Sequence, residues 1–352
     1  MMKTISKRPK ICALIFVLVL FWRILGAPLN AEDIQNVKIA FWQARTLLPD
    51  RASRMLKLWL NAENGKDGVN ANADNIAVYS EQDEKIIYLP LEEYVQGVVA
   101  AEMPAQYHME ALKAQTVAAR TRVIWQMEQG GCERFPGAAI CTDSAHCQGY
   151  ASAEACREKW GNDYEVYAER IAQAQRQTQG EWIAYQNEPI AVLYHAISGG
   201  QTEDAQTVFA QSVPYLVSVQ SPNEEDVRGY WMEKKLSYTE MCQKLSGEDG
   251  FSNLTEEELQ RSFAILDYTQ SGRVKNVQIG ERQLEANRLR TLLELRSTWF
   301  SISADDEGIT FYTRGYGHGV GMSQAGANAM AASGMDYQQI LRHYYTGVDI
   351  AE

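Results

Sequence analysis

The sequence lacks the excess of basic residues that nucleic-acid-binding proteins carry. Of its 352 residues, 33 are Lys or Arg and 45 are Asp or Glu, which gives a formal net charge of −12. Five of the cations and none of the acids fall within residues 1–30, so the remainder carries 33 − 5 = 28 basic against 45 acidic residues, net −17. This balance argues against nucleic acid as a partner and is compatible with an uncharged or mixed-charge polymer.

Signatures of several common enzyme classes are also missing. The sequence contains no His-Glu-x-x-His pattern, which would indicate a zinc peptidase, and no Lys-Ser/Thr pair closing a glycine-rich P-loop. It shows neither an internal repeat nor a low-complexity segment. A zinc-dependent peptidase or amidase is therefore the least favoured hypothesis.

Only one long hydrophobic run occurs, and it lies at the N-terminus. A basic stretch from Lys3 to Lys10 precedes an apolar run from Ile11 to Trp22, which Arg23 interrupts. The run is short for a membrane span, although the side chain of Arg23 can reach the interface and extend it. A signal peptide cleaved after Ala31 is the alternative. We expect an uncleaved single-pass anchor in the cell membrane, with the N-terminus in the cytoplasm and the body outside it.

The remaining sequence predicts an α+β fold of mixed helices and antiparallel hairpins that form a substrate cleft. Apolar residues at helical spacing alternate with short β-branched and aromatic runs separated by turn residues. Residues 61–75 are polar and rich in Gly and Asn, as is typical of a loop. We therefore expect a cytoplasmic tail and membrane anchor at 1–30, a juxtamembrane spacer at 31–75, and one compact body at 76–350.

The hydrophobic periodicity also predicts the elements of this body. Helices are expected over 91–103, 105–127, 163–179, 238–244, 255–263, 281–293, 322–332 and 337–345. Hairpins are expected from 76–79 with 86–88, 182–185 with 190–196, 264–268 with 274–279, and 298–303 with 308–313.

Glu102 is the candidate general acid. It lies in the last turn of the first expected helix, because Pro104 disfavours helical geometry at Met103. The helix dipole disfavours an anion at that end, and the residues beside Glu102 carry no charge. Such surroundings raise the pKa of a carboxyl group, as a general acid requires. The alternative is an ordinary solvated glutamate at a helix end. On these physical arguments alone, that alternative is favoured over the general acid.

Three cysteines and one histidine gather in a short loop that also contains Gly and Pro. They are Cys132, Cys141, His146 and Cys147. Thiolates with an imidazole form the soft ligand set that suits tetrahedral zinc. Four protein ligands would make the site closed and structural, whereas three would leave a position for water. The alternatives are a disulfide between Cys141 and Cys147, and free thiols.

A strand followed by glycines presents a second set of polar side chains. Tyr194, His195 and Ser198 precede the glycines at 199 and 200, which let a ligand approach the backbone. Nothing in the spacing supplies an acid to orient His195, so a serine hydrolase is not indicated. The alternative is a hairpin end with a satisfied histidine.

A third segment alternates glycine with other residues over 315–321. It carries Tyr316 and His318 and leads into a helix N-terminus near Met322, which offers free backbone donors. A phosphate could bind there, but polar side chains on so flexible a loop suit a sugar or peptide cleft. The alternative is a tight packing loop.

Together these segments resemble the stage II sporulation protein D family, which includes the amidase-enhancer proteins. The resemblance covers roughly residues 76–350 and rests on separated motifs in the same order. They are Leu91-Glu92-Glu93-Tyr94-Val95 through Ala101-Glu102-Met103-Pro104, Ala114-Gln115 with Ala118-Ala119-Arg120-Thr121, Tyr194-His195 with Ser198-Gly199-Gly200, and Gly315-Tyr316-Gly317-His318-Gly319-Val320-Gly321-Met322-Ser323-Gln324.

The resemblance implies a lytic transglycosylase that cleaves the β-1,4 bond between N-acetylmuramic acid and N-acetylglucosamine in peptide-stripped glycan, leaving a 1,6-anhydro end. Glu102 matches the family's catalytic glutamate. A hydrolase usually needs two carboxylates, whereas a transglycosylase needs one, since the sugar's own 6-hydroxyl is the nucleophile. By the same match, the residues expected to line the cleft and bind substrate are Arg120, Tyr194, His195, Ser198, Tyr316, His318 and Gln324.

The cysteine-containing loop is similar to the zinc-binding form found in clostridial relatives, but with one departure. Those relatives commonly place a histidine six residues before the first cysteine of the loop Cys141–Gln148, and here that position is Phe135. Cys132 or a water could supply the missing ligand. We expect one zinc ion in a structural role.

The resemblance further implies a role in spore engulfment at the mother-cell septal membrane. The expected partners are peptidoglycan glycan strands, the sporulation amidase (stage II sporulation protein P) and membrane protein M of the same complex. A non-catalytic peptidoglycan-binding module that recruits or stimulates an amidase is the second hypothesis. The presence of Glu102 favours the enzyme over this module.

Overall fold

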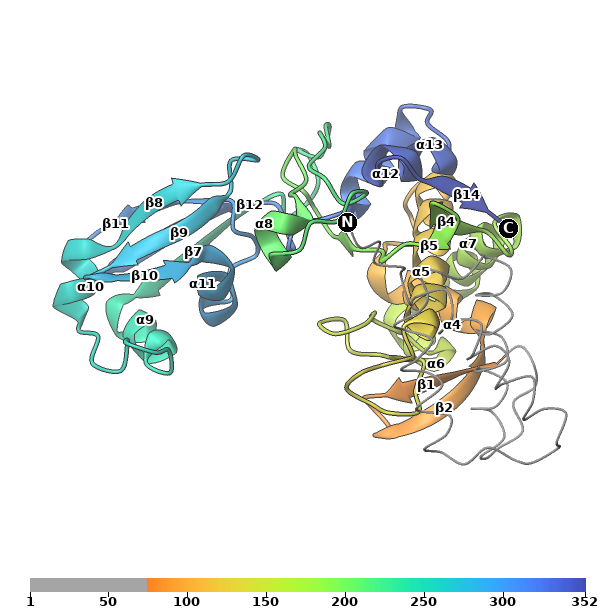
Figure 1. The fold of residues 1–352 in the computed structure, drawn as a ribbon, viewed down its shortest axis with the longest axis horizontal. Helices are drawn as coiled ribbons and strands as arrows, with labels where there is room; N and C mark the ends of the chain where they lie inside the picture. Colours follow the sequence, from red (N-terminus) through yellow and green to blue (C-terminus); the bar gives the residue numbers. More distant parts are fainter. Residues whose placement is uncertain (1–74) are drawn as a thin grey trace, which may run out of the picture. The chain divides into compact units, whose positions relative to one another are not determined.

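The computed structural model describes residues 75–352 (Figure 1). The expected anchor at 1–30 and all but the last residue of the expected spacer at 31–75 lie outside the described residues. Within 75–352, none of the helices combines the length and apolar composition that crossing a membrane requires. The fold is α+β, as the sequence predicts, with short sheets arranged around helices.

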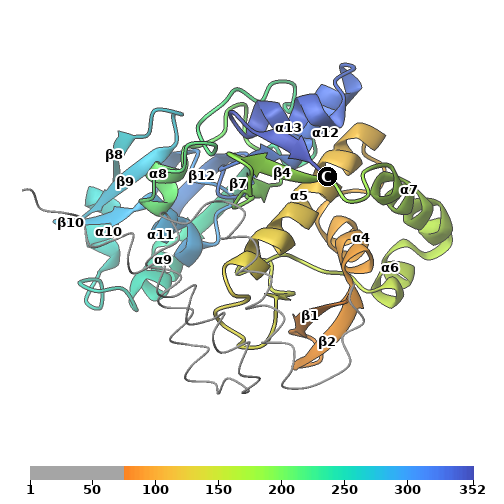
Figure 2. The same cartoon turned by 45° about the vertical axis from the view of Figure 1, so that its right-hand side comes forward.

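Helix α5 (Met109–Glu128) is the centre of the first hydrophobic core. Its alanines at 111, 114, 118 and 119 are fully buried, and such small side chains allow neighbouring helices to approach closely. The helices that contact it (Figure 2) are α4 (Leu91–Glu102), α7 (Tyr164–Gln177), α12 (Gln324–Ala332) and α13 (Tyr337–Tyr344). The C-terminal helices thus return to the helix that follows Glu102.

Short sheets and helices complete this part of the chain. One sheet has the order β2 (Lys85–Pro90), β1 (Asn75–Ser80), β3 (Ile140–Cys141), and another β14 (Asp349–Ala351), β4 (Trp182–Tyr185), β5 (Glu188–Pro189). A third joins β6 (Tyr194–His195) in parallel to β13 (Met322–Ser323). The remaining elements are α6 (Ala153–Trp160), the 3-10 helix η2 (Gly161–Asp163) and α8 (Ala205–Phe209).

Residues 231–314 build a second hydrophobic core, inserted between α8 and β13. Two antiparallel sheets, ordered β11-β12-β7 and β10-β9-β8, enclose it with three helices (Figure 1). The elements are β7 (Trp231–Ser237), α9 (Tyr238–Leu245), α10 (Glu256–Ser262), β8 (Ala264–Tyr268), β9 (Val274–Ile279), β10 (Arg282–Glu285), α11 (Ala286–Leu293), β11 (Phe300–Ala304) and β12 (Gly308–Arg314). The expected single body therefore contains a segment with a core of its own, because the inserted residues bury their own apolar side chains.

Most expected elements are confirmed, and the main differences have local causes. Helix α5 begins at Met109 rather than at 105, since the segment after Pro104 forms a turn in which the His108 N–H donates to Asn328 Oδ1 at 2.8 Å. The first part of the helix expected at 281–293 is strand β10 instead.

The hairpin expected from 182–185 with 190–196 is only partly correct. The strand that pairs with β4 is Glu188–Pro189, just before the expected second strand, whereas Tyr194–His195 of that strand pairs with Met322–Ser323. This pairing joins two segments that lie far apart in the sequence, and it brings both polar glycine-bearing loops together.

Candidate active site and metal centre

Glu102 is the last residue of α4, as the sequence predicts. Met103 leaves the helix in an extended conformation (φ −126°, ψ 138°) ahead of Pro104. The Gly149 N–H donates to Glu102 Oε1 at 2.8 Å. Burial raises the pKa of the Glu102 carboxyl group, and the hydrogen bonds from Gly149 and Gln324 oppose this rise only in part. A carboxyl group in this setting can hold a proton and release it, as general acid–base catalysis requires.

The Gly149 hydrogen bond depends on glycine at that position. A side-chain carbon at Gly149 would lie 2.8 Å from Glu102 Oε1, closer than non-bonded carbon and oxygen atoms come. The preceding residue, Gln148, donates from Nε2 to the Tyr194 hydroxyl oxygen at 3.0 Å. Residues 148–149 therefore approach Glu102 and Tyr194 together.

Tyr194 reaches this site from β6, whose partner β13 directly precedes Gln324. Burial raises the pKa of Tyr194 well above its ordinary value, and the nearby charge of Glu102 adds to this. The phenol therefore stays protonated at neutral pH and can act as a hydrogen-bond donor. Gln324 Nε2 also donates to Gln115 Oε1 on α5 at 3.4 Å, so both glutamine side chains lie in this region.

His195, which follows Tyr194 in the sequence, and His318 form a pair of neutral side chains. Their ring centroids are 5.7 Å apart. His195 Nδ1 lies 3.1 Å from the Val320 carbonyl oxygen and so donates to it, which leaves Nε2 as a buried atom without a partner. His318 Nδ1 accepts from the Val320 N–H at 3.1 Å. Burial lowers the pKa of His195 well below its usual value and that of His318 to about 4, so neither ring carries a charge at neutral pH.

The cysteine-containing loop brings its four candidate ligands together. The Sγ atoms of Cys132, Cys141 and Cys147 lie 3.7, 3.4 and 3.3 Å from His146 Nδ1, and all four ligand atoms are within 4.8 Å of one another. Around a tetrahedral zinc ion with ordinary bond lengths, sulfur–nitrogen separations are about 3.6 Å and sulfur–sulfur separations about 3.8 Å. The geometry of this Cys3His group could therefore hold a metal ion.

The same geometry bears on the alternatives of a disulfide and of a water as the fourth ligand. The sulfur atoms of Cys132 and Cys147 are 3.9 Å apart, and all three cysteines of the group are free thiols rather than disulfides. Phe135 stacks on Tyr79 with ring centroids 3.6 Å apart, and the Cys132 sulfur is the atom that completes the group of four candidate ligands.

Comparisons with known proteins now bear on the identity of the chain. The family model described as "Stage II sporulation protein" matches residues 79–185, which include Glu102 and the Cys3His loop. Stage II sporulation protein D of Bacillus subtilis (strain 168) is 36% identical over 292 residues, 83% of either chain. The protein of the same name from Bacillus amyloliquefaciens is 36% identical over 282 residues, 79% of either chain.

The chain belongs to the stage II sporulation protein D family. A sporulation role follows from that membership. A protein named "Amidase enhancer" from Bacillus subtilis (strain 168) is also similar, with 26% identity over 305 residues, 73% of this chain and 40% of the relative.

Ser198, one of the residues expected to line the family's cleft, lies inside the protein instead. It is fully buried, and its Oγ donates to Glu224 Oε2 at 2.9 Å. Glu224 is itself fully buried and accepts three further hydrogen bonds, from the Gly199 N–H (3.0 Å), Ser221 Oγ (2.6 Å) and Ser323 Oγ (2.6 Å). Ser198 therefore holds the loop in place and does not face a ligand.

Arg120 is also placed away from Glu102, contrary to expectation. It is fully buried, and its Nε and Nη2 donate to the two carboxylate oxygens of Glu92 at 2.7 Å each. Its Nη1 donates to the Glu181 carbonyl oxygen at 3.0 Å. Glu92 lies in the first turn of α4, ten residues and about 15 Å of helix from Glu102. Arg120 joins α5 to the start of α4 and to the segment before β4.

Tyr316, in contrast, is accessible to ligands. Its side chain is 45% exposed, and the guanidinium of Arg296 lies 4.7 Å from its ring centroid. Its backbone pairs with Ile197 through two hydrogen bonds, which links the glycine-rich loop to the segment after β6.

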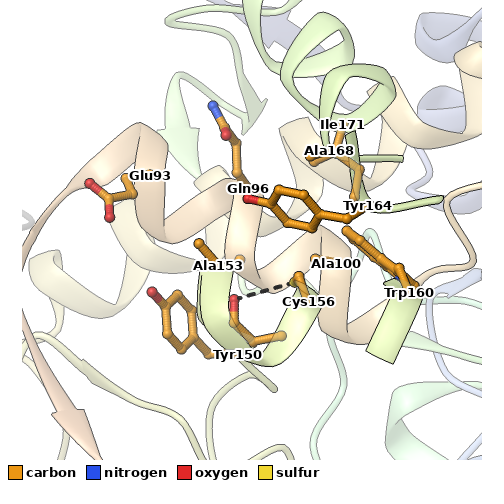
Figure 3. Close-up of a pocket in the computed structure, with 12 residues that line it drawn as sticks. Glu93, Gln96, Ala100, Tyr150, Ala153, Cys156, Trp160, Tyr164, Ala168 and Ile171 are labelled. Carbon is orange, nitrogen blue, oxygen red and sulfur yellow. Dashed lines mark hydrogen bonds between the residues drawn. The ribbon is translucent and has the colours of Figure 1, made fainter. Parts of the chain in front are cut away.

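A small pocket of about 100 Å³ lies on another face of α4 (Figure 3). Its lining includes Gln96, Cys156, Trp160 and Tyr164, and none of the predicted site residues. The pocket has room for a few waters but not for a disaccharide, so it is not the substrate site.

The sequence did not single out the residues that support the site. Gln148 and Gly149 follow the last metal ligand directly, so the metal motif could have suggested them. Nothing in the sequence distinguishes the buried Glu224 from the exposed Glu225 beside it, because only the tertiary structure decides which carboxylate meets four donors.

Proposed function

We propose that this chain is a peptidoglycan lytic transglycosylase that acts during spore engulfment, with Glu102 as its single catalytic acid and base. The main support is that burial raises the pKa of Glu102. In addition, no second carboxylate of the described chain contacts it. Two fully buried carboxylates of the described chain, Glu203 and Glu224, are bound by hydroxyl and amide donors. One available carboxyl group suits internal attack by the substrate better than hydrolysis, which usually uses two.

The reaction needs one proton carrier in both halves. Glu102 gives its proton to the glycosidic oxygen as the bond from that oxygen to C1 of N-acetylmuramic acid breaks. The sugar's 6-hydroxyl oxygen then bonds to C1, and its proton passes to Glu102. The carboxyl group is restored, no water is consumed, and the product carries a 1,6-anhydro end. Tyr194 and Gln324 are placed to position the sugar beside Glu102.

Zinc is the metal that we propose for the Cys3His group, held by Cys132, Cys141, His146 and Cys147. A bound zinc ion fixes the conformation of its loop. Because four protein ligands close the coordination shell, its role would be structural. The loop continues from Cys147 directly into Gln148 and Gly149, which contact Tyr194 and Glu102. The ion would therefore set the position of the hydrogen-bond donor to the catalytic carboxyl group.

The cellular setting that we propose follows from the family. The chain would be held in the cell membrane by its N-terminal segment, with the catalytic body outside the cytoplasm. There it would act on peptide-free glycan strands beside the sporulation amidase, stage II sporulation protein P, and membrane protein M of the engulfment complex.

The alternative function is a non-catalytic peptidoglycan-binding module that recruits or stimulates an amidase. The similarity to a protein named "Amidase enhancer" favours it. The retained, partly desolvated carboxyl group of Glu102 favours the enzyme, since a recruiting surface needs no proton donor.

Digestion of peptide-free glycan strands by the full-length protein, followed by mass spectrometry, distinguishes the two. We expect anhydro-ended fragments from the wild-type protein and from Glu93→Gln, an exposed glutamate on the same helix. We expect none from Glu102→Gln and fewer from chelator-treated protein. A folded, zinc-loaded protein that releases no fragments would favour the amidase-recruiting module.

A further inference from the structure

A row of two tryptophans and one arginine crosses the outer face of the sheet β11-β12-β7. Trp231 lies opposite Arg314 in the strand register, and the Arg314 N–H donates to the Trp299 carbonyl oxygen at 2.8 Å. The Arg314 guanidinium lies 3.5 Å from the ring centroid of Trp299 and 5.9 Å from that of Trp231. Trp231 is 62% exposed, an unusual degree for so large an apolar side chain.

A second stacked arginine lies on the neighbouring backbone. Arg296 stacks on Tyr316, and its carbonyl oxygen accepts from the Gly317 N–H at 2.9 Å. The adjacent Ser297 Oγ donates to the Arg314 carbonyl oxygen at 2.6 Å. Both stacked arginines therefore lie where the second core meets the glycine-rich loop.

Neither arginine has an anionic partner among the residues that the structure describes. Within residues 75–352, the side chains of Arg296 and Arg314 form no ion pair and no hydrogen bond, and Arg314 Nε is buried without an acceptor. Glu233 occupies the same sheet face opposite Tyr312, yet it does not pair with Arg314. Stacking fixes the plane of a guanidinium and leaves its edge free, and that edge matches the two oxygens of a carboxylate.

Buried contacts link the segment of the Arg296–Tyr316 pair to the strand that carries Tyr194. Gly317 packs so closely on His195 that an added side-chain carbon would lie 2.7 Å from His195 Cβ. His195 follows Tyr194, whose hydroxyl group lies beside Glu102. The segment that carries Tyr316 therefore packs on the segment that carries Tyr194 and His195.

We propose that Arg296 and Arg314 bind the free lactyl carboxylates of N-acetylmuramic acid, while Tyr316 and Trp231 pack against the sugar rings. This inference rests on the proposed peptidoglycan substrate. In intact peptidoglycan each lactyl carboxyl group forms an amide bond to a stem peptide. An amidase must cleave that bond to release the free carboxylate. Carboxylate binding by the two arginines is thus a structural basis for the preference for peptide-free glycan proposed above, and aromatic rings beside guanidinium groups form a typical binding surface.

Binding to chemically matched strands tests the proposal without cleavage. Full-length Glu102→Gln protein in detergent is titrated calorimetrically with peptide-free glycan, with the same glycan converted to N-methylamides, and with glycan that retains its stem peptides. We expect the free-carboxylate strand to bind about tenfold more tightly than either other strand.

Three substitutions assign this preference to residues. Arg296→Gln and Arg314→Gln should each remove most of the difference between the carboxylate and N-methylamide strands. Arg261→Gln, which alters an exposed arginine on α10 of the same core, should leave the difference unchanged. Arg314→Lys keeps the positive charge but lacks the planar guanidinium group, so we expect an intermediate preference. This variant replaces Arg314→Gln if Arg314→Gln does not fold.

The outcomes separate this inference from the enzymatic proposal. Equal binding of the carboxylate and N-methylamide strands would overturn the inference, as would arginine variants that weaken all three strands equally. Selective binding by a wild-type protein that releases no anhydro ends would overturn the transglycosylase and leave carboxylate recognition intact.

Discussion

Glu102 is partly buried and Glu224 is fully buried, and the protein surrounds the two carboxyl groups in opposite ways. Glu102 receives one backbone hydrogen bond, from Gly149, together with Gln324, and burial raises its pKa. Glu224 is fully buried and accepts four hydrogen bonds, three from serine hydroxyls and one from a backbone N–H. A carboxyl group with few donors can exchange a proton, whereas one with a full set of donors ties loops together.

Replacing the carboxyl group of Glu102 gives the largest expected effect on activity. Glu102→Gln removes the proton carrier from both halves of the reaction, so we expect release of anhydro ends to fall by 10³-fold or more. The thermal midpoint should change little, because the amide keeps the shape of the side chain. Turnover numbers and melting curves measured on one preparation check both statements. Near-normal turnover would show that Glu102 is not the catalytic acid and base.

Replacing Glu224, in contrast, is expected to lower stability. Glu224→Ala leaves four buried donors without their acceptor, so we expect the free energy of unfolding to fall by about 3 kcal/mol or more. Urea denaturation measures this loss, and Glu225→Ala, at an exposed neighbour, is the matched control. A loss no larger than that of the control would show that Glu224 is not the framework residue described above.

Disturbing the metal group tests how Glu102 obtains its donor. Cys132→Ser should reduce bound zinc and lower activity roughly tenfold, because the loop that holds Gly149 loses its fixed geometry. Metal analysis and turnover are measured together, with Cys242→Ser, outside the Cys3His group, as the control. Full activity in a protein shown to hold no metal would separate the metal group from the active site.

The raised pKa of Glu102 also predicts a small effect of pH on stability. The folded state holds the Glu102 proton to a higher pH than the unfolded chain does. The contribution of this group to stability is therefore complete below the unfolded pKa, about 4.3, and is lost as pH rises through the folded pKa. Relative to Glu102→Gln, the wild-type protein should lose stability over that window. Unfolding free energies of both proteins at several pH values measure it, and a gain with rising pH would show that the shift has the opposite sign.

Much of the candidate site could be predicted from the sequence because it depends on local rules. Pro104 forces the helix to end just after Glu102, whatever surrounds it. The Cys3His group is similarly local, since Cys141, His146 and Cys147 lie within one loop. Cys132 remained one of two options until the structure placed its sulfur beside His146.

Other predictions failed where the partners are distant in the sequence. The motif around Arg120 suggested a cleft residue, but its guanidinium is bound by Glu92 and the Glu181 carbonyl group. Strand β6 was expected to pair within a local hairpin, yet it pairs with β13, more than a hundred residues later. Such pairings depend on which surfaces the two cores leave free, and no local pattern carries that information.

The sequence by itself determined the end of helix α4, the soft ligand set and the glycine-rich loop, because each depends on the conformational preferences or donor atoms of neighbouring residues. The tertiary structure alone decided that Gly149 donates to Glu102 and that Glu224 is the carboxylate with four donors. It also decided that Arg296 and Arg314 bind no carboxylate within residues 75–352. Those outcomes depend on desolvation and on contacts between distant segments, which exist only once the chain has folded.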